Sequence, residues 1–243
     1  MQTDHIAEPP LGVVREEVSS LARLVWGDGI TRRFATLVLS CCAAIIALHV
    51  AGLLMPQDVK LGRMIWNNFN VTGEGNLAAH FGYGLLFLSM MLFVVSAMVS
   101  GSRAAVFCAA VCGFLWMDDS IQYHEKMAGK LIPLLGLEDR LGLRGQDVGE
   151  LLAWGLAGAV LLVVLIHALR QRRPGDIGLL VVAIACFAGL TVFGGFVDML
   201  HSIFVDQHDA LIGLLEDGGE LLVMGVIAGL SLGVLRQSET YFD

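Results

Sequence analysis

The chain has 243 residues, of which 56% are hydrophobic and only 16% charged, and its mean hydropathy is +0.73. Since soluble domains carry about 25% charged residues, this composition excludes a typical soluble enzyme, a disordered chain and a repeat solenoid. The net charge of −8 argues against nucleic acid as a partner, because phosphate recognition needs clustered basic residues.

The first 33 residues are polar and form the first of three predicted regions, which are 1–33, 34–237 and 238–243. Within this region the apolar residues Val14, Val18, Leu21 and Val25 recur at helical spacing. They predict a short amphipathic helix that lies on the inner membrane surface. We expect no cleaved signal peptide, since the region lacks an apolar core of the required length.

Region 34–237 contains six apolar runs, which we predict to be transmembrane helices because about 20 helical residues cross the hydrocarbon core. The runs are Phe34–Met55, Leu77–Val99, Ala104–Met117, Leu151–Leu169, Ile177–Val197 and Leu221–Leu235. The predicted fold class is therefore an all-α bundle of six transmembrane helices in a lipid bilayer. All five cysteines lie inside these runs, so we expect them to pack in the core rather than to form disulfides.

Basic residues predict the orientation of the bundle. Nine of the 15 Lys and Arg residues fall on the side of the two termini, and six fall on the other side. Because short basic loops stay cytoplasmic, we predict that both termini are cytoplasmic. Fifteen of the 23 Asp and Glu residues fall on the opposite, outer side, where they would concentrate cations and repel anions.

Some of these acids lie at membrane depth. The third and sixth runs are too short to cross, and extending each to about 20 residues draws Asp118, Asp119, Glu216 and Glu220 into the bilayer margin. Ionisable groups at that depth are costly and usually face a cavity, a partner or an ion. We therefore predict a functional site at the outer ends of the helices.

Helical spacing groups these acids with histidines. Asp198 and His201 are three residues apart and Glu216 and Glu220 four apart, so each pair shares a helix face. Between Asp118 and Glu125, however, a straight helix would point His124 about 120° away from Asp118. Either the helix loosens there, or some of these side chains do not bind an ion directly and instead form hydrogen bonds to the residues that bind it.

Asp-x-x-His steps combined with carboxylates from other helices build carboxylate-bridged metal sites in helical bundles. We therefore predict a site for one or two metal ions, and the mixture of oxygen and imidazole ligands suits iron, manganese or zinc. The candidate ligands are Glu74, Asp118, Asp119, His124, Glu125, Asp198, His201, Glu216 and Glu220.

Two further patterns concern helix packing. The segment Gly149–Gly155 is identical to Gly219–Gly225 at five of seven positions, which predicts that spans three–four and five–six are related helical hairpins. This repeat would place Glu150 and Glu220 in equivalent positions. The series Gly225, Gly229 and Gly233 predicts a close approach of two helices.

The residues also resemble a family. Phe69-Asn-Val-Thr-Gly-Glu74-Gly-Asn76, then Asp118-Asp119-x4-His124-Glu125, then Glu216-x3-Glu220 resembles the pattern of a widespread group of bacterial polytopic membrane proteins. The resemblance extends from about Trp66 to Leu235, and it differs where Asp119 and Asp198 replace the expected Glu. It implies a multi-pass protein of the bacterial inner membrane, and it supports the choice of site residues without supplying a reaction.

Several functions remain open at this point. The first is a metalloprotein that acts as an oxidase, hydroxylase or hydrolase on a lipid or quinone-like small molecule. The second is a proton- or cation-coupled transporter or sensor, although the nearly uncharged inner halves of the spans disfavour a complete conduit. The third is an accessory subunit whose acids pair with a membrane-protein partner. A haem-binding variant that uses His49, His80 or His201 is a minor fourth.

Overall fold

The computed structural model describes residues 11–139, 143–197 and 209–242. Every regular element in these residues is helical: α1 (Leu11–Gly27), α2 (Gly29–Leu54), α3 (Lys60–Phe69), α4 (Leu77–Ser100), α5 (Arg103–Ile121), α6 (Tyr123–Leu135), α7 (Gly145–Arg170), α8 (Asp176–Thr191), the π-helix η1 (Val192–Val197), α10 (Asp209–Arg236) and α11 (Ser238–Tyr241).

Six helical segments are long and apolar enough to cross a membrane: α2, α4, α5, α7, α8 with η1, and α10. This confirms the predicted all-α fold with six candidate spans. The third and sixth spans extend beyond their apolar runs, as the length argument predicted. Helix α5 continues through Asp118 and Asp119, and α10 begins upstream of Glu216 and Glu220.

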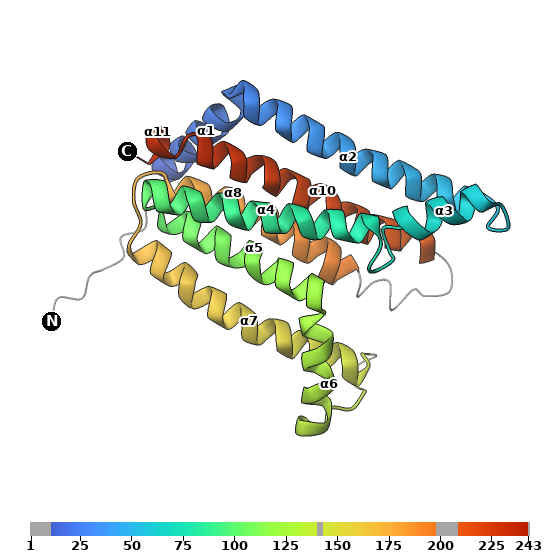
Figure 1. Ribbon diagram of the computed structural model, residues 1–243. Helices are drawn as coiled ribbons and strands as arrows, with labels where there is room; N and C mark the ends of the chain where they lie inside the picture. The colour runs from blue at the N-terminus through green and yellow to red at the C-terminus, as the bar shows by residue number, and fades with distance from the viewer. Residues whose placement is uncertain (1–10, 140–142, 198–208, 243) are drawn as a thin grey trace.

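The spans run alternately between two ends of the bundle (Figure 1). One end carries α1 and α11 and is called the α1 end; the other carries α3 and α6 and is called the α6 end. Helices α3 and α6 were not predicted, because each is short and partly polar. Every carboxylate of the predicted metal site that the structure describes belongs to the α6 end.

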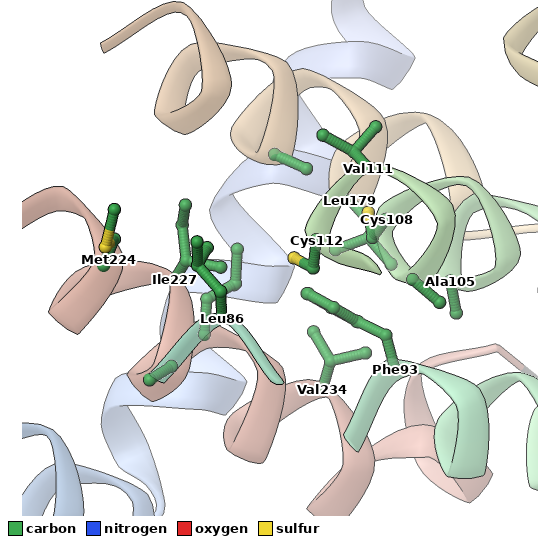
Figure 2. Packing of buried hydrophobic residues seen from close by; sticks show 14 of the residues in the cluster. Leu86, Phe93, Ala105, Cys108, Val111, Cys112, Leu179, Met224, Ile227 and Val234 are labelled. Atoms are coloured by element: carbon green, nitrogen blue, oxygen red, sulfur yellow. The ribbon is translucent and has the colours of Figure 1, made fainter. Parts of the chain in front are cut away.

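The core lies between α4, α5, α8 and α10, where Leu86, Phe93, Cys108, Leu179 and Ile227 are almost fully buried (Figure 2). Three of the five cysteines, Cys42, Cys108 and Cys112, are buried in this core, Cys186 packs partly buried against it, and all five are free thiols. Helix α7 lies at the periphery and is the least buried of the spans, which leaves most of its apolar surface for lipid.

Helix α10 approaches α2 closely along its glycines. A Cβ atom on Gly225 would lie 3.1 Å from Cys42 Sγ, and one on Gly229 would lie 2.9 Å from the Cβ of Ala35. A Cβ atom on Gly233 would likewise meet residues of α1 and α2. The prediction that the glycine series lets two helices approach is therefore confirmed.

At the α1 end, α1 forms the predicted amphipathic helix and buries Leu21 and Val25 against the bundle. Asp28 caps α2 by accepting a hydrogen bond from the Thr31 backbone N–H, and it pairs with Arg236 of α10 at 2.6 Å. The short helix α11 packs as well, because Tyr241 is buried and its hydroxyl donates to the Glu17 carbonyl.

A buried carboxylate joins α5 and α8 at the same end. Asp176 accepts hydrogen bonds from the Ser102 hydroxyl at 2.5 Å and from the Arg173 backbone N–H at 2.8 Å. Its position in the first turn of α8 places its charge at the positive end of the helix dipole. These contacts tie the helices together at the α1 end.

Candidate functional site

The site begins with a break in the helix that follows the third span. Helix α5 ends at Ile121, Gln122 adopts a left-handed backbone conformation with φ of 55°, and α6 starts at Tyr123. Figure 1 shows α6 leaving the end of α5 steeply and crossing the start of α7. The helix therefore does loosen between Asp118 and His124, which is one of the two arrangements that the spacing of these residues allows.

The break folds His124 back onto Asp118. One carboxylate oxygen of Asp118 accepts the His124 backbone N–H at 3.0 Å, and the other lies 2.9 Å from the imidazole Nδ1. Asp118 is fully buried, whereas the His124 side chain is 27% exposed. The carboxylate thus satisfies a free N–H in the first turn of α6 and fixes the imidazole ring, which leaves Nε2 for other chemistry.

The environment of His124 favours its protonated form. The hydrogen bond to Asp118 raises the pKa of the imidazole above its usual 6.5, against the opposing effect of burial, and the charges of Glu150 and Glu125 act in the same direction. On the α7 side the ring lies 6.1 Å from the ring of Trp154. The Gln146 amide donates to Glu150 at 2.7 Å and orients that carboxylate.

Helix α6 is held against α7 by a close backbone approach. A Cβ atom on Gly149 would lie 2.9 Å from the Cβ atom and 3.0 Å from the Cα atom of Ala128, which is fully buried. Only a residue without a side chain fits there. Gly149 therefore determines how near His124 of α6 comes to Glu150 and Trp154 of α7.

A second group of acids lies between α4, α5 and α10. The phenol of Tyr83 on α4 is within electrostatic range of four carboxylates, which belong to Glu74, Asp119, Asp217 and Glu220. Asp119 is also within range of His124. The acids therefore form two neighbouring groups: the His124 cluster (Asp118, His124, Glu125, Glu150 and Trp154) and the Tyr83 cluster (Glu74, Tyr83, Asp119, Asp217 and Glu220).

The loop before α4 links the two clusters. The Asn76 side chain caps α4 by accepting from the Ala79 N–H, and its amide donates to the Asn70 and Gly73 carbonyls. Glu74 does not cap the helix; its carboxylate instead accepts a hydrogen bond from the Gln122 amide at the break between α5 and α6.

Glu220 packs against the π-helix that ends the fifth span. The Glu220 carboxylate occupies the space that a side chain on Gly194 of η1 would take. In the reverse direction, the Phe193 ring of η1 occupies the space that a side chain on Gly219 of α10 would take. A π-helical turn widens the backbone and recurs at functional sites. Gly194 therefore lets Glu220 sit against η1, because any side chain at that position would collide with the carboxylate.

The structure thus gathers the predicted acids at one end but does not place them around one point. Of the nine candidate ligands, Asp118, His124 and Glu125 fall in the His124 cluster, and Glu74, Asp119 and Glu220 in the Tyr83 cluster. Glu216 is half-buried on α10 one turn before Glu220. Asp198 and His201 lie outside the described residues.

Within the described ranges, no group of three or more His, Cys, Asp or Glu side chains is arranged to hold a metal ion. Sequence reasoning singled out the acids and His124, but it missed the part that Tyr83, Gln122 and Trp154 play around them. A tyrosine facing the bundle and a tryptophan beside Glu150 carry no distinctive spacing, so only the packing of the helices reveals them.

The fold and the site define the class of the protein: it is a multi-pass helical membrane protein with a polar site at one end of the bundle. Residues 36–234 match DUF8692, a domain of unknown function, and the chain belongs to this family. A search of curated proteins and a search of solved structures found no match.

Proposed function

We propose that this protein transfers protons through His124 at the α6 end of the bundle and acts there on a lipid or a quinone-like molecule. The observation that carries the proposal is the buried Asp118 carboxylate, which holds His124 by its Nδ1. Such a pair fixes the tautomer and keeps Nε2 in position to take up or release a proton.

The lipophilic substrate follows from the position of the site. His124 lies against α7, the span with the most exposed apolar surface, and Leu151, Leu152 and Trp154 of α7 are all more than a third exposed. A molecule dissolved in the bilayer can reach this face without crossing the bundle. Glu150 and Glu125 are half-buried carboxylates whose charges act on His124.

A local site agrees better with the packing than a through-path does. The Ser89 and Ser231 hydroxyls, in the middle of the described core, donate to carbonyls of their own helices. Because both hydroxyls are used in these hydrogen bonds, they do not form a chain that passes protons across the bundle. A transporter would need polar groups through the full thickness.

The test is untargeted profiling of lipids and quinones in membranes from cells that express the wild type, His124→Gln or the matched control His167→Gln. His167 is exposed near the far end of α7. The wild type and the control are expected to change the abundance of at least one membrane-soluble compound, and His124→Gln is expected to abolish the change. Identical profiles for the wild type and His124→Gln would contradict the proposal.

The second candidate function is metal binding by iron, manganese or zinc. The specific observation in its favour is again Asp118, since histidines that bind metals commonly donate their other ring nitrogen to a carboxylate. In that arrangement Asp118 would support His124 instead of binding the ion, while Glu125 and Glu150 lie nearest to it. The carboxylates of the Tyr83 cluster would serve a second ion.

Elemental analysis of protein purified in mild detergent without chelators tests this candidate. Metal binding predicts near-stoichiometric metal in the wild type, loss in His124→Ala, and loss of the second ion in Glu220→Ala. Folded protein that contains no metal would exclude this candidate, and the proton-transfer proposal would remain.

We also propose that the α6 end faces the outside of a bacterial inner membrane. Arg32, Arg33, Arg103 and Arg170 flank span ends at the α1 end, and such residues are retained on the cytoplasmic side. Both termini would then be cytoplasmic. Cysteine labelling at an exposed position of each end, Glu138→Cys and Glu239→Cys, tests the orientation.

A further inference from the structure

At the α1 end, far from the acids, a narrow apolar groove runs between α2, α8 and α10. Its volume is about 80 Å³, and its walls include Trp26, Ala35, Leu39, Val182, Cys186 and Val226. The Thr31 hydroxyl, which also borders the groove, already donates to Asp28 at 2.6 Å. The groove therefore offers almost no polar contact, and its occupant must be apolar.

The size of the groove restricts that occupant further. Pockets for small molecules measure about 300–1,000 Å³, and this groove lies well below that range. The residues of α2 that line it run from Thr31 to Leu39, which is roughly 12 Å along a helix that rises 1.5 Å per residue. A thin chain that enters near the membrane surface and follows α2 inward fits this shape.

The neighbouring row of α2 is basic and polar. Thr31, Ala35 and Leu39 line the groove. The residues that follow each of them, Arg32, Thr36 and Ser40, line a second, shallow and open hollow together with Arg33 and Leu37. Successive residues of a helix point about 100° apart, so the two rows lie on adjoining faces of α2, and Arg32 and Arg33 belong to the beginning of the span.

The charges of the two arginines are not neutralised within the described part of the chain. Neither Arg32 nor Arg33 has an ion pair there, and both are exposed. The nearby Asp28 carboxylate pairs with Arg236 instead, and this pairing holds the pKa of Asp28 well below its usual range. A basic pocket at the end of a span is suited to an anionic lipid headgroup.

We propose that this surface is a binding site for an anionic phospholipid, with one acyl chain in the groove between α2, α8 and α10 and the headgroup phosphate on Arg32 and Arg33. The site is separate from the His124 and Tyr83 clusters. It does not depend on the function proposed for them, and it does not require a particular orientation in the membrane.

Native mass spectrometry of the full chain from detergent micelles tests the proposal with phosphatidylglycerol and phosphatidylcholine of identical acyl chains. We expect tighter binding of phosphatidylglycerol. The double variant Arg32→Gln, Arg33→Gln is expected to weaken that binding by about tenfold or more, because each arginine near a headgroup adds a favourable electrostatic contribution. Arg103→Gln, an exposed arginine at the same end, is the matched control and is expected to bind as the wild type does.

A second pair of variants tests the groove itself. Val226→Trp places a large side chain in the groove and is expected to weaken the binding of both lipids. Val160→Trp lies on the exposed face of α7 and is expected to leave the binding of both lipids unchanged. Cys186→Trp repeats the first test from α8 if Val226→Trp fails to fold. Equal affinity for the two headgroups, or wild-type binding by both the arginine and the groove variants, would overturn the proposal.

Discussion

Asp118→Ala is expected to release α6 from the end of α5 and to reduce the free energy of unfolding by about 3 kcal/mol, since each hydrogen bond to a charged group contributes roughly 1.5–3 kcal/mol. The lost bonds are those to the His124 backbone N–H and to its imidazole. Unfolding in mixed detergent micelles measures the loss. Asp119→Ala is the matched control and is expected to reduce the free energy of unfolding by less. This neighbouring carboxylate is only partly buried, and the hydrogen bonds with His124 are formed by Asp118.

The same pair predicts a pH dependence whose sign follows from the pKa of His124. Because the folded-state pKa is raised above the unfolded value of 6.5, the ion pair stabilises the fold fully below pH 6.5 and loses this effect as the pH rises through the raised pKa. The difference in unfolding free energy between the wild type and Asp118→Asn should therefore be largest on the acid side. A difference that grows with pH would contradict the assignment of the charge to His124.

The six spans could be predicted from the sequence because burial in lipid demands long apolar runs, and nothing else in the chain produces them. The same argument placed Asp118, Asp119 and Glu220 inside helices at the membrane edge, since their spans were otherwise too short. These predictions depend on length and hydropathy alone. They need no knowledge of which helices are neighbours.

The division of the acids into two clusters could not be predicted, because it depends on that neighbourhood. Gln122 carries no turn signal of the kind that glycine, proline or asparagine supplies, yet it adopts the left-handed conformation that separates α5 from α6. In the π-helix, by contrast, Gly194 and Gly195 were a visible signal of irregular backbone. Only the structure shows that Glu220 occupies the space beside Gly194.

The two clusters also differ in their surroundings. The charges of Glu74 and Glu220 both act on Tyr83, whereas His124 is partly exposed and lies against Trp154 of α7. The predicted single site is thus divided between a partly exposed histidine and a group of acids around Tyr83. Asp119 is within electrostatic range of both Tyr83 and His124.

Gly149→Leu is expected to push α6 away from α7 and to destroy the His124 cluster while the six spans remain folded. A leucine side chain would have to displace the Ala128 backbone, whose Cα atom lies 3.0 Å from the position of the new Cβ atom. Overpacking of this kind costs about 1–3 kcal/mol, and the strain falls on the short helix α6 rather than on the core of the bundle.

Gly155→Leu on the same helix is the matched control, because a Cβ atom at Gly155 meets nothing within 4 Å. Histidine NMR and Trp154 fluorescence, read in an otherwise tryptophan-free background, would report the change. We expect Gly149→Leu to return the His124 pKa toward 6.5 and to shift the Trp154 emission, and Gly155→Leu to do neither. If both variants left the His124 pKa raised, the contact between α6 and α7 would not be what positions the histidine, and the bond to Asp118 alone would account for its state.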